Sequence, residues 1–137
     1  MSVDVCRRGT RFQYTYYYPG SGDQAIRLSR NHSQSPTQSN PIHESISQLD
    51  HEAMEILTIP PNTGSSSHHY FAEYLAKTKN TICGRHPIGV LLGALGTLEK
   101  DGRSVKLKWV RYEQSSKCLT LQDSSVSYAS AYVQFCH

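Results

Sequence analysis

Long hydrophobic runs are missing from this sequence. No stretch of about 18 consecutive apolar residues occurs, which predicts a chain without a membrane-spanning helix that does not insert into a membrane. The opening residues, MSVDVCRRGT, also contain no apolar segment of the kind that forms the centre of a secretory signal. We therefore expect a cytoplasmic protein, with the nucleus as the second candidate compartment.

A strong charge imbalance is missing too. The chain carries 14 Lys and Arg against 11 Asp and Glu, a net charge of +3, and the basic residues are dispersed. A nucleic-acid-binding surface needs a denser basic patch. The segment RFQYTYYY (11–18) could stack on single-stranded bases, but half-buried strands are routinely rich in aromatic residues. We expect no nucleic-acid partner.

Closely spaced pairs of cysteines are also missing from the sequence. The four cysteines, Cys6, Cys83, Cys118 and Cys136, are widely and irregularly spaced, with no C-x-x-C pair. Without an export signal, reduced thiols are expected. A structural zinc site needs about four ligands, and His68-His69 is merely an adjacent pair, so a complete zinc site is not predicted.

The chain has 137 residues, which suits a single domain over 1–137 with one core. Its hydrophobic content of 37% is low, partly because residues 29–40 contain only polar residues and proline. Such a segment buries too little apolar surface to offset its ordering entropy, so we expect a loop or disordered insertion there.

Hydrophobic periodicity predicts helices packed on a mixed sheet, an α/β arrangement. The expected strands are 11–18, 104–112 and 125–133, and the expected helices are 41–49, 50–57, 67–80 and 86–100.

Capping signals set these helix boundaries. Asn40 suits an N-cap with Pro41 at the first helical position, and Asp50 suits the cap of a second short helix. Gly102 is expected to end the helix at 86–100. In the last strand, Val126, Tyr128 and Tyr132 alternate with smaller residues.

Cys83 is the main candidate for chemistry. It precedes a predicted helix N-terminus, where backbone N–H groups favour anions, and Arg85 and His86 add positive charge. These groups favour the thiolate, which attacks electrophiles or binds metals. A small buried side chain at a helix–loop junction explains the same pattern and is the commoner case. The three-residue spacing of Cys83 and His86 also suits a partial metal site.

Two further clusters are weaker candidates. Asp4 and Cys6 share the period of a strand, but a frayed N-terminus is the plainer interpretation. Asp123, with the serines that follow it, suggests a hydrolase triad, yet Asp-Ser-Ser is a common turn signature and no G-x-S-x-G motif occurs.

Several strings, taken together, closely resemble the Memo family, which is named for mediating cell motility downstream of ErbB receptor tyrosine kinases. In chain order they are DVCRRG (4–9), RFQYTYYY (11–18), NTICGRHPIGVLL (80–92), QSSKC (114–118) and QDSSVSYA (122–129). The match covers most of the chain, with gaps at about 19–40 and 58–66.

The resemblance implies a fold similar to that of class III extradiol dioxygenases, which use non-haem iron. It also implies a copper or iron site in a vestibule, held by two histidines and one cysteine. The cysteine matches Cys83, and the vestibule aspartate matches Asp4. Memo proteins are linked to copper-dependent redox activity, to iron handling and to binding of receptor phosphotyrosine segments.

The departures from the family weaken the expected site. The chain resembles only the C-terminal portion of the family, so the segments with the two histidine ligands are absent. Arg7 replaces a vestibule histidine and Arg8 a tryptophan. A guanidinium opposes metal binding and cannot act as a base. We therefore expect a truncated Memo-like protein with an incomplete site and weak or absent metal binding, which argues against catalytic activity.

Two alternatives remain. One is a non-catalytic module that binds phosphotyrosine peptides or other protein partners through Arg7, Arg8, Arg11 and Arg85. Ordinary solvated arginines are the plainer interpretation. The other is a fragment without independent function, because the missing strands would leave sheet edges exposed.

Overall fold

The computed structural model of this chain describes residues 2–8, 15–17, 26–28, 40–120 and 123–136. At 2–8, 15, 16, 26–28, 124 and 136 only the backbone is described. Most of the aromatic segment 11–18, which is predicted as a strand, and residues 29–39 of the polar segment lie outside these ranges.

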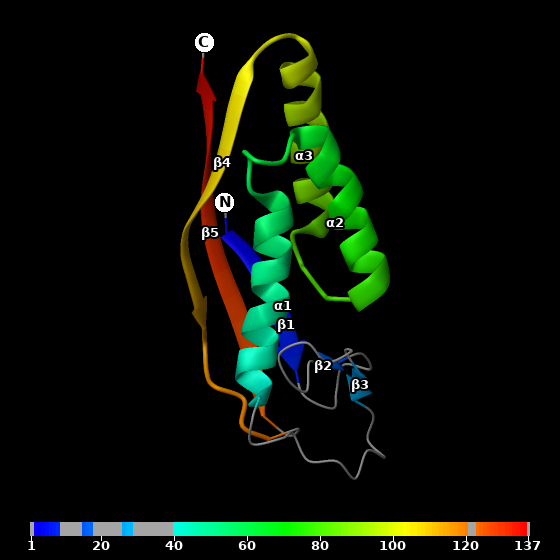
Figure 1. Cartoon of the computed structure of the whole chain (residues 1–137). Coiled ribbons are helices and arrows are strands. Elements are labelled where there is room, and N and C mark those ends of the chain that lie inside the picture. Colours follow the sequence, from blue (N-terminus) through cyan, green and yellow to red (C-terminus); the bar gives the residue numbers. More distant parts are fainter. Residues whose placement is uncertain (1, 9–14, 18–25, 29–39, 121–122, 137) are drawn as a thin grey trace.

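In the described residues, the order of elements along the chain is three short strands, three helices and two long strands (Figure 1). They are β1 (Ser2–Arg8), β2 (Thr15–Tyr17), β3 (Ile26–Leu28), α1 (Ile42–Leu57), α2 (Gly64–Thr78), α3 (Arg85–Lys100), β4 (Ser104–Gln114) and β5 (Ser124–Cys136).

The larger sheet has the strand order β1-β5-β4, and both of its strand pairs are antiparallel. Strands β2 and β3 form a separate antiparallel pair. The expectation of a mixed sheet is therefore wrong for the described strands. Consecutive β4 and β5 can pair antiparallel through a short loop, whereas parallel neighbours would need a long crossover connection.

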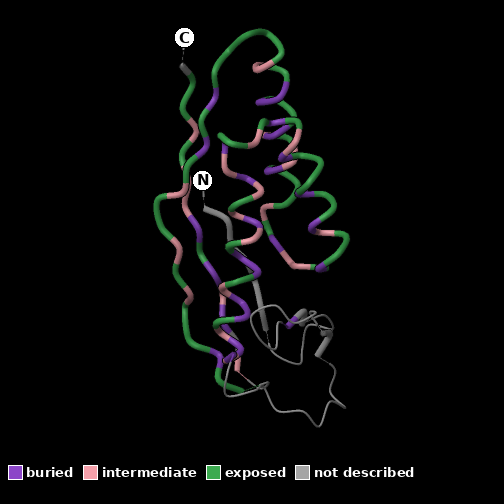
Figure 2. The backbone as a smooth tube through the Cα atoms, viewed as in Figure 1, coloured by how far each residue is buried: buried purple, intermediate pink, exposed green. Residues whose placement is uncertain are grey.

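The core lies between one face of this sheet and the helices, and Figure 2 shows buried positions along the facing sides of these elements. Its buried side chains come from α1, α2, α3, β4 and the connecting loops. They are Ala53, Leu57, Ile59, Phe71, Tyr74, Ile82, Ile88, Leu92, Leu95, Val105 and Leu107. Within the described ranges, none of the helices combines the length and apolarity needed to cross a bilayer.

A single helix, α1, replaces the two short helices that the sequence predicts at 41–49 and 50–57. Asp50 lies buried inside this helix, where its carboxylate accepts a hydrogen bond from Tyr112 instead of capping a helix end. Pro41, not Asn40, is the N-cap residue. Asn40 is itself buried, and its carbonyl accepts a hydrogen bond of 2.7 Å from the Tyr17 hydroxyl.

Strand β5 turns its small residues, not its tyrosines, toward the helices. Ser125, Ser127 and Ala129 are buried, whereas Tyr128 and Tyr132 are each 46% exposed on the opposite face. The alternation is thus confirmed, but the large side chains occupy the outer face. The inner face has little room because the side chain of Tyr112 already fills the space there, with its hydroxyl 3.3 Å from Ser127 Oγ.

The start of α2 lies close to the end of α3. A Cβ on Gly64 would lie 2.3 Å from the backbone nitrogen of Gly96, so both positions require glycine. Glu99 of α3 accepts the Gly64 N–H at 2.8 Å. Helix α2 starts three residues before the predicted 67 because Thr63 and Ser66 form a capping box.

Candidate functional site

Cys83 lies in the turn that joins α2 to α3, directly before the N-cap residue Gly84. Its side chain is exposed, whereas the preceding Ile82 is buried in the core. The Ile82 carbonyl accepts the Arg85 N–H at 3.1 Å, and the Gly84 carbonyl accepts the Ile88 N–H at 2.9 Å. The buried isoleucine and these two bonds fix the turn and present the thiol at the surface, so the interpretation of Cys83 as a buried packing residue is wrong.

The N-terminus of α3 offers few donors to an anion. Arg85 already uses its N–H on the Ile82 carbonyl, and Pro87, within the first turn, has none. The Ile88 N–H is used by Gly84. The side chains of Arg85 and His86 are exposed, so they place positive charge and an imidazole at this surface without burying either.

A complete metal site is not formed by the side chains that the structure describes. Among them, no group of three or more His, Cys, Asp or Glu residues is arranged to hold a metal ion. The adjacent pair on α2 is not such a site: His69 lies 3.4 Å from Glu73, one helical turn away, and the two are an ion pair when the imidazole is protonated.

Asp4 and Arg7, the two vestibule positions, lie on β1. Asp4 is opposite Tyr128 and Arg7 is opposite Ser125 in the β1–β5 register. Their side chains lie outside the described part of the chain, so whether Asp4 approaches Cys83 stays a prediction. The register does show that β1 pairs with β5, whose first residues, SSVSYA, belong to QDSSVSYA, so two of the strings that resemble the Memo family are neighbours in the sheet.

Serine contacts join QSSKC to QDSSVSYA as well. Ser125 Oγ donates to the Ser116 carbonyl at 2.6 Å, and Ser115 Oγ accepts the Val126 N–H at 3.0 Å. Ser125 is buried with 3% of its surface exposed. These bonds close the loop between β4 and β5, so QSSKC and the first part of QDSSVSYA have a structural role.

Asp123 also has a structural role, which contradicts the hydrolase reading. Its carboxylate accepts the backbone N–H groups of Thr120 at 2.8 Å and Leu119 at 2.9 Å. These hydrogen bonds from the backbone hold the pKa of Asp123 below its ordinary value of 3.8. The carboxylate therefore closes a turn, as the Asp-Ser-Ser signature indicates.

Cys118, in contrast to Cys83, is a packing residue. It is 3% exposed and forms a small cluster with Ile42 and Ile46 at the start of α1. Its carbonyl accepts the His43 N–H at 3.2 Å. The two described thiols thus have opposite environments, which makes Cys118 a natural comparison for Cys83.

A partly buried polar network was not anticipated from the sequence. Tyr112 donates to Asp50 at 2.8 Å, and the Gln114 amide donates to both the Tyr112 hydroxyl and the His43 carbonyl at 2.9 Å. Burial is the main cause that raises the pKa of Tyr112 above its ordinary value of 10.0, and the negative charge of Asp50 raises it further. One feature of the sequence could have indicated this network. Asp50 falls four residues after Ile46, so it lies on the apolar face of its helix, where a carboxylate needs a hydrogen-bond donor.

Comparison with known proteins gives one consistent family. The family described as Memo-like protein matches residues 1–132. The chain is 40% identical over 131 residues to Protein MEMO1 of Mus musculus and of Homo sapiens, an alignment that covers 95% of this chain and 36% of each relative. It is 38% identical over 143 residues to the MEMO1 family protein MHO1 of Saccharomyces cerevisiae, covering 97% and 41%. The chain thus spans about two fifths or less of the length of these relatives.

Proposed function

This chain belongs to the Memo family, and on that premise we propose that it is a metal-related Memo-like protein in which Cys83 supplies one ligand of a copper or iron site. The observation that supports this role is the exposed thiol directly before the N-cap residue of α3, inside one of the strings that resemble the family. Redox activity and a link to motility signalling are parts of the same proposal, as is a dioxygenase-like architecture of the complete family fold.

The described donors do not fit a complete site. Cys83 is accompanied by no second and third ligand among the side chains that the structure describes. One thiolate alone binds copper or iron weakly, because transition-metal sites in proteins need several donors in a fixed geometry. We therefore derive no catalytic step through the metal, and we propose that the chain supplies one ligand of a site that it does not complete by itself.

Metal titration of the isolated chain tests this proposal. Cuprous or ferrous ion would be titrated anaerobically against a competing chelator, with the wild-type chain, Cys83→Ser and Cys118→Ala compared. We expect weak uptake that is reduced by Cys83→Ser and retained in Cys118→Ala, since only the first thiol is exposed. A thermal melt of each variant controls for folding.

Two outcomes would contradict parts of the proposal. Tight, stoichiometric uptake that disappears in Cys83→Ser would show that the chain carries a complete site. Uptake that is identical in Cys83→Ser and the wild type would remove Cys83 from the ligand set.

A second candidate function is recognition of phosphotyrosine peptides. Among the four arginines that suggest it, Arg85 is the one whose side chain is described, and it is exposed beside the N-terminus of α3. A guanidinium in this position suits a phosphate ligand. A pull-down with phosphorylated and unphosphorylated receptor-tail peptides tests the idea. Preferential recovery of the phosphorylated peptide, lost in Arg85→Ala, supports it, and equal recovery of both peptides contradicts it.

A further inference from the structure

The turn that presents Cys83 is attached to α1 by hydrogen bonds that lie outside the candidate site. Nδ2 of Asn80, just after the end of α2, donates a hydrogen bond of 2.7 Å to the Tyr74 hydroxyl. That hydroxyl donates in turn to the Leu49 carbonyl of α1 at 2.9 Å. Residues 79–84, which join α2 to α3, are thus connected to a helix that precedes both of them in the chain.

The inner end of this connection lies in the protein interior. Tyr74 is 3% exposed and Leu49 is 0% exposed. A buried hydroxyl and a buried carbonyl have lost their hydration, so each needs a hydrogen-bond partner. The next residue of α1, Asp50, accepts the hydrogen bond from Tyr112, which fixes this part of α1 to the sheet. The Leu49 carbonyl is therefore a firm point of attachment for the turn.

The backbone where the turn begins has an uncommon conformation. Lys79 has a φ of 54°, in the left-handed region that residues other than glycine adopt infrequently. The Thr78 hydroxyl donates to the Tyr74 carbonyl at 2.8 Å and accepts the Asn80 N–H at 3.2 Å. Asn80 therefore bonds to α2 through both its backbone and its side chain, and it holds the chain directly after the left-handed residue.

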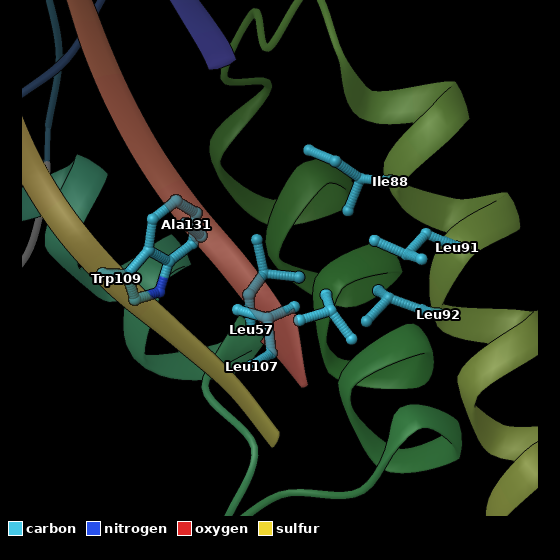
Figure 3. A pocket seen from close by; sticks show the side chains of 8 residues that line it. Leu57, Ile88, Leu91, Leu92, Leu107, Trp109 and Ala131 are labelled. Atoms are coloured by element: carbon cyan, nitrogen blue, oxygen red, sulfur yellow. The ribbon is translucent and has the colours of Figure 1, made fainter. Parts of the chain in front are cut away.

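Apolar contacts hold the other end of the turn. Ile82 and Ile88, on either side of the exposed Cys83, are 2% and 3% exposed. In Figure 3, Ile88 points from α3 toward the sheet, where it lines an apolar cavity of about 30 Å³. Hydrophobic packing is not directional, and a side chain that lines a cavity lacks contacts on that side. The directed hydrogen bonds of Asn80 therefore restrain the position of the turn more specifically than this packing does.

We propose that Asn80 is a positioning residue for Cys83. Its hydrogen bond to Tyr74 fixes the turn at 79–84 against α1, and so holds the thiol in one place beside the N-terminus of α3. Asn80 acts through the turn and the Tyr74 hydroxyl, not by contact with a ligand. What the thiol binds belongs to the function proposed above, whereas this placement is a property of the chain without any ligand.

Backbone relaxation and amide exchange, measured by NMR on the whole chain, test this role. In Asn80→Ala we expect the heteronuclear NOE of the Cys83 amide to fall, because the turn gains fast motion. We also expect faster exchange of the Arg85 N–H, which is bonded to the Ile82 carbonyl within the turn. The expected increase is about two- to tenfold, which corresponds to the loss of one hydrogen bond.

Asn62→Ala is the matched control for a general loss of stability. Asn62 also donates from Nδ2 to the backbone of α1, to the carbonyls of Glu55 and Ile56 at 3.1 Å each. It precedes α2, at the opposite end of that helix from the turn. We therefore expect this variant to leave the Cys83 NOE and the Arg85 exchange rate unchanged. Equal changes in Asn62→Ala and Asn80→Ala would overturn the proposal.

Tyr74→Phe keeps the ring but removes the hydroxyl, so it should change the Cys83 NOE and the Arg85 exchange in the same direction. In this background, Asn80→Ala should add little, because its partner is already gone. Full additivity of the two substitutions would overturn the proposal, as would a folded Asn80→Ala with wild-type values of both quantities. If Asn80→Ala does not fold, Tyr74→Phe decides, and a wild-type Cys83 NOE in that variant overturns the proposal. Neither measurement involves a metal, so failure of the metal titration leaves this result unaffected.

Discussion

The hydroxyl of Tyr112 donates a hydrogen bond of 2.8 Å to Oδ2 of Asp50, and this bond joins β4 to the middle of α1. Asp50 is only 2% exposed, so its carboxylate depends on such donors. The Gln114 amide extends the connection to the His43 carbonyl, near the start of the same helix. The helix is thus attached to the sheet by polar contacts as well as by apolar packing.

Replacing Tyr112 with Phe should destabilise the fold. The substitution keeps the ring but removes a donor from a buried carboxylate, and such a loss costs about 1–3 kcal/mol of unfolding free energy. Urea denaturation measures the effect. Tyr132→Phe is the matched control, because Tyr132 is 46% exposed on the outer face and should be nearly neutral. Equal effects of the two substitutions would contradict a specific role for the Tyr112 hydroxyl.

The same tyrosine should make stability fall at alkaline pH. The pKa of Tyr112 is raised in the folded state, so its contribution is fully present below pH 10.0, the ordinary value that also describes the unfolded chain. It is lost as the pH rises above 10.0 toward the folded pKa, because the unfolded chain releases the proton first.

This dependence is measured as a difference between two proteins, because the chain has nine tyrosines and a single curve would not isolate the contribution of Tyr112. The free energies of unfolding of the wild type and Tyr112→Phe would be compared at successive pH values from neutral to alkaline. The difference in free energy of unfolding between the wild type and Tyr112→Phe should become smaller above pH 10.0. A difference that stays constant would show that the Tyr112 proton is not linked to folding.

Two glycines of α3 should respond to alanine in opposite ways. A Cβ on Gly96 would lie 2.5 Å from Ser65 Oγ and 3.0 Å from the Ser65 nitrogen, whereas a Cβ on Gly93 meets nothing within 4 Å. We expect Gly96→Ala to cost about 1–3 kcal/mol through overpacking. Gly93→Ala should stabilise the helix by about 0.5–1 kcal/mol. Thermal melts compare them, and a stabilising Gly96→Ala would contradict the close helix contact.

The serine contacts between β4 and β5 give a further prediction. Ser125→Ala removes the hydroxyl that donates to the Ser116 carbonyl at 2.6 Å and accepts the Ser116 N–H at 3.3 Å. We expect a loss of about 1–3 kcal/mol in urea denaturation, since these backbone groups lose a partner. Ser104→Ala, at the exposed start of β4, is the control. If both variants unfold alike, the serine contacts contribute no stability.

The helices and strands with strong local periodicity were predictable. Helix α3 begins one residue before the predicted 86 and ends at Lys100, and Gly102, with a φ of 82°, follows it as expected. Strand β4 buries Val105 and Leu107 and exposes Lys106 and Lys108. In α3 the apolar period and the glycine stop signal agree, and in β4 the alternation is strong by itself, so local information was sufficient.

Features that depend on distant partners were not predictable. Asp50 looked like a helix cap because the sequence does not show that Tyr112, 62 positions later, reaches it. The alternation in β5 was predictable, but pattern alone cannot tell which of its two faces the helices cover. At the candidate site, the position of Cys83 before a helix was predictable, but the number of donors around it depends on segments far apart in the chain.

The pairing of β1 with β5 has a consequence for the order of folding. Helices α2 and α3 are neighbours in sequence, as are β4 and β5, so these pairs close short loops. Strand β1 instead brings the two ends of the chain together, with Ser2 opposite Ser130. Closing so long a loop has the largest entropic cost, which places this contact late on the folding path. The strand that carries Asp4 is therefore expected to join a helical layer and a hairpin that have already formed.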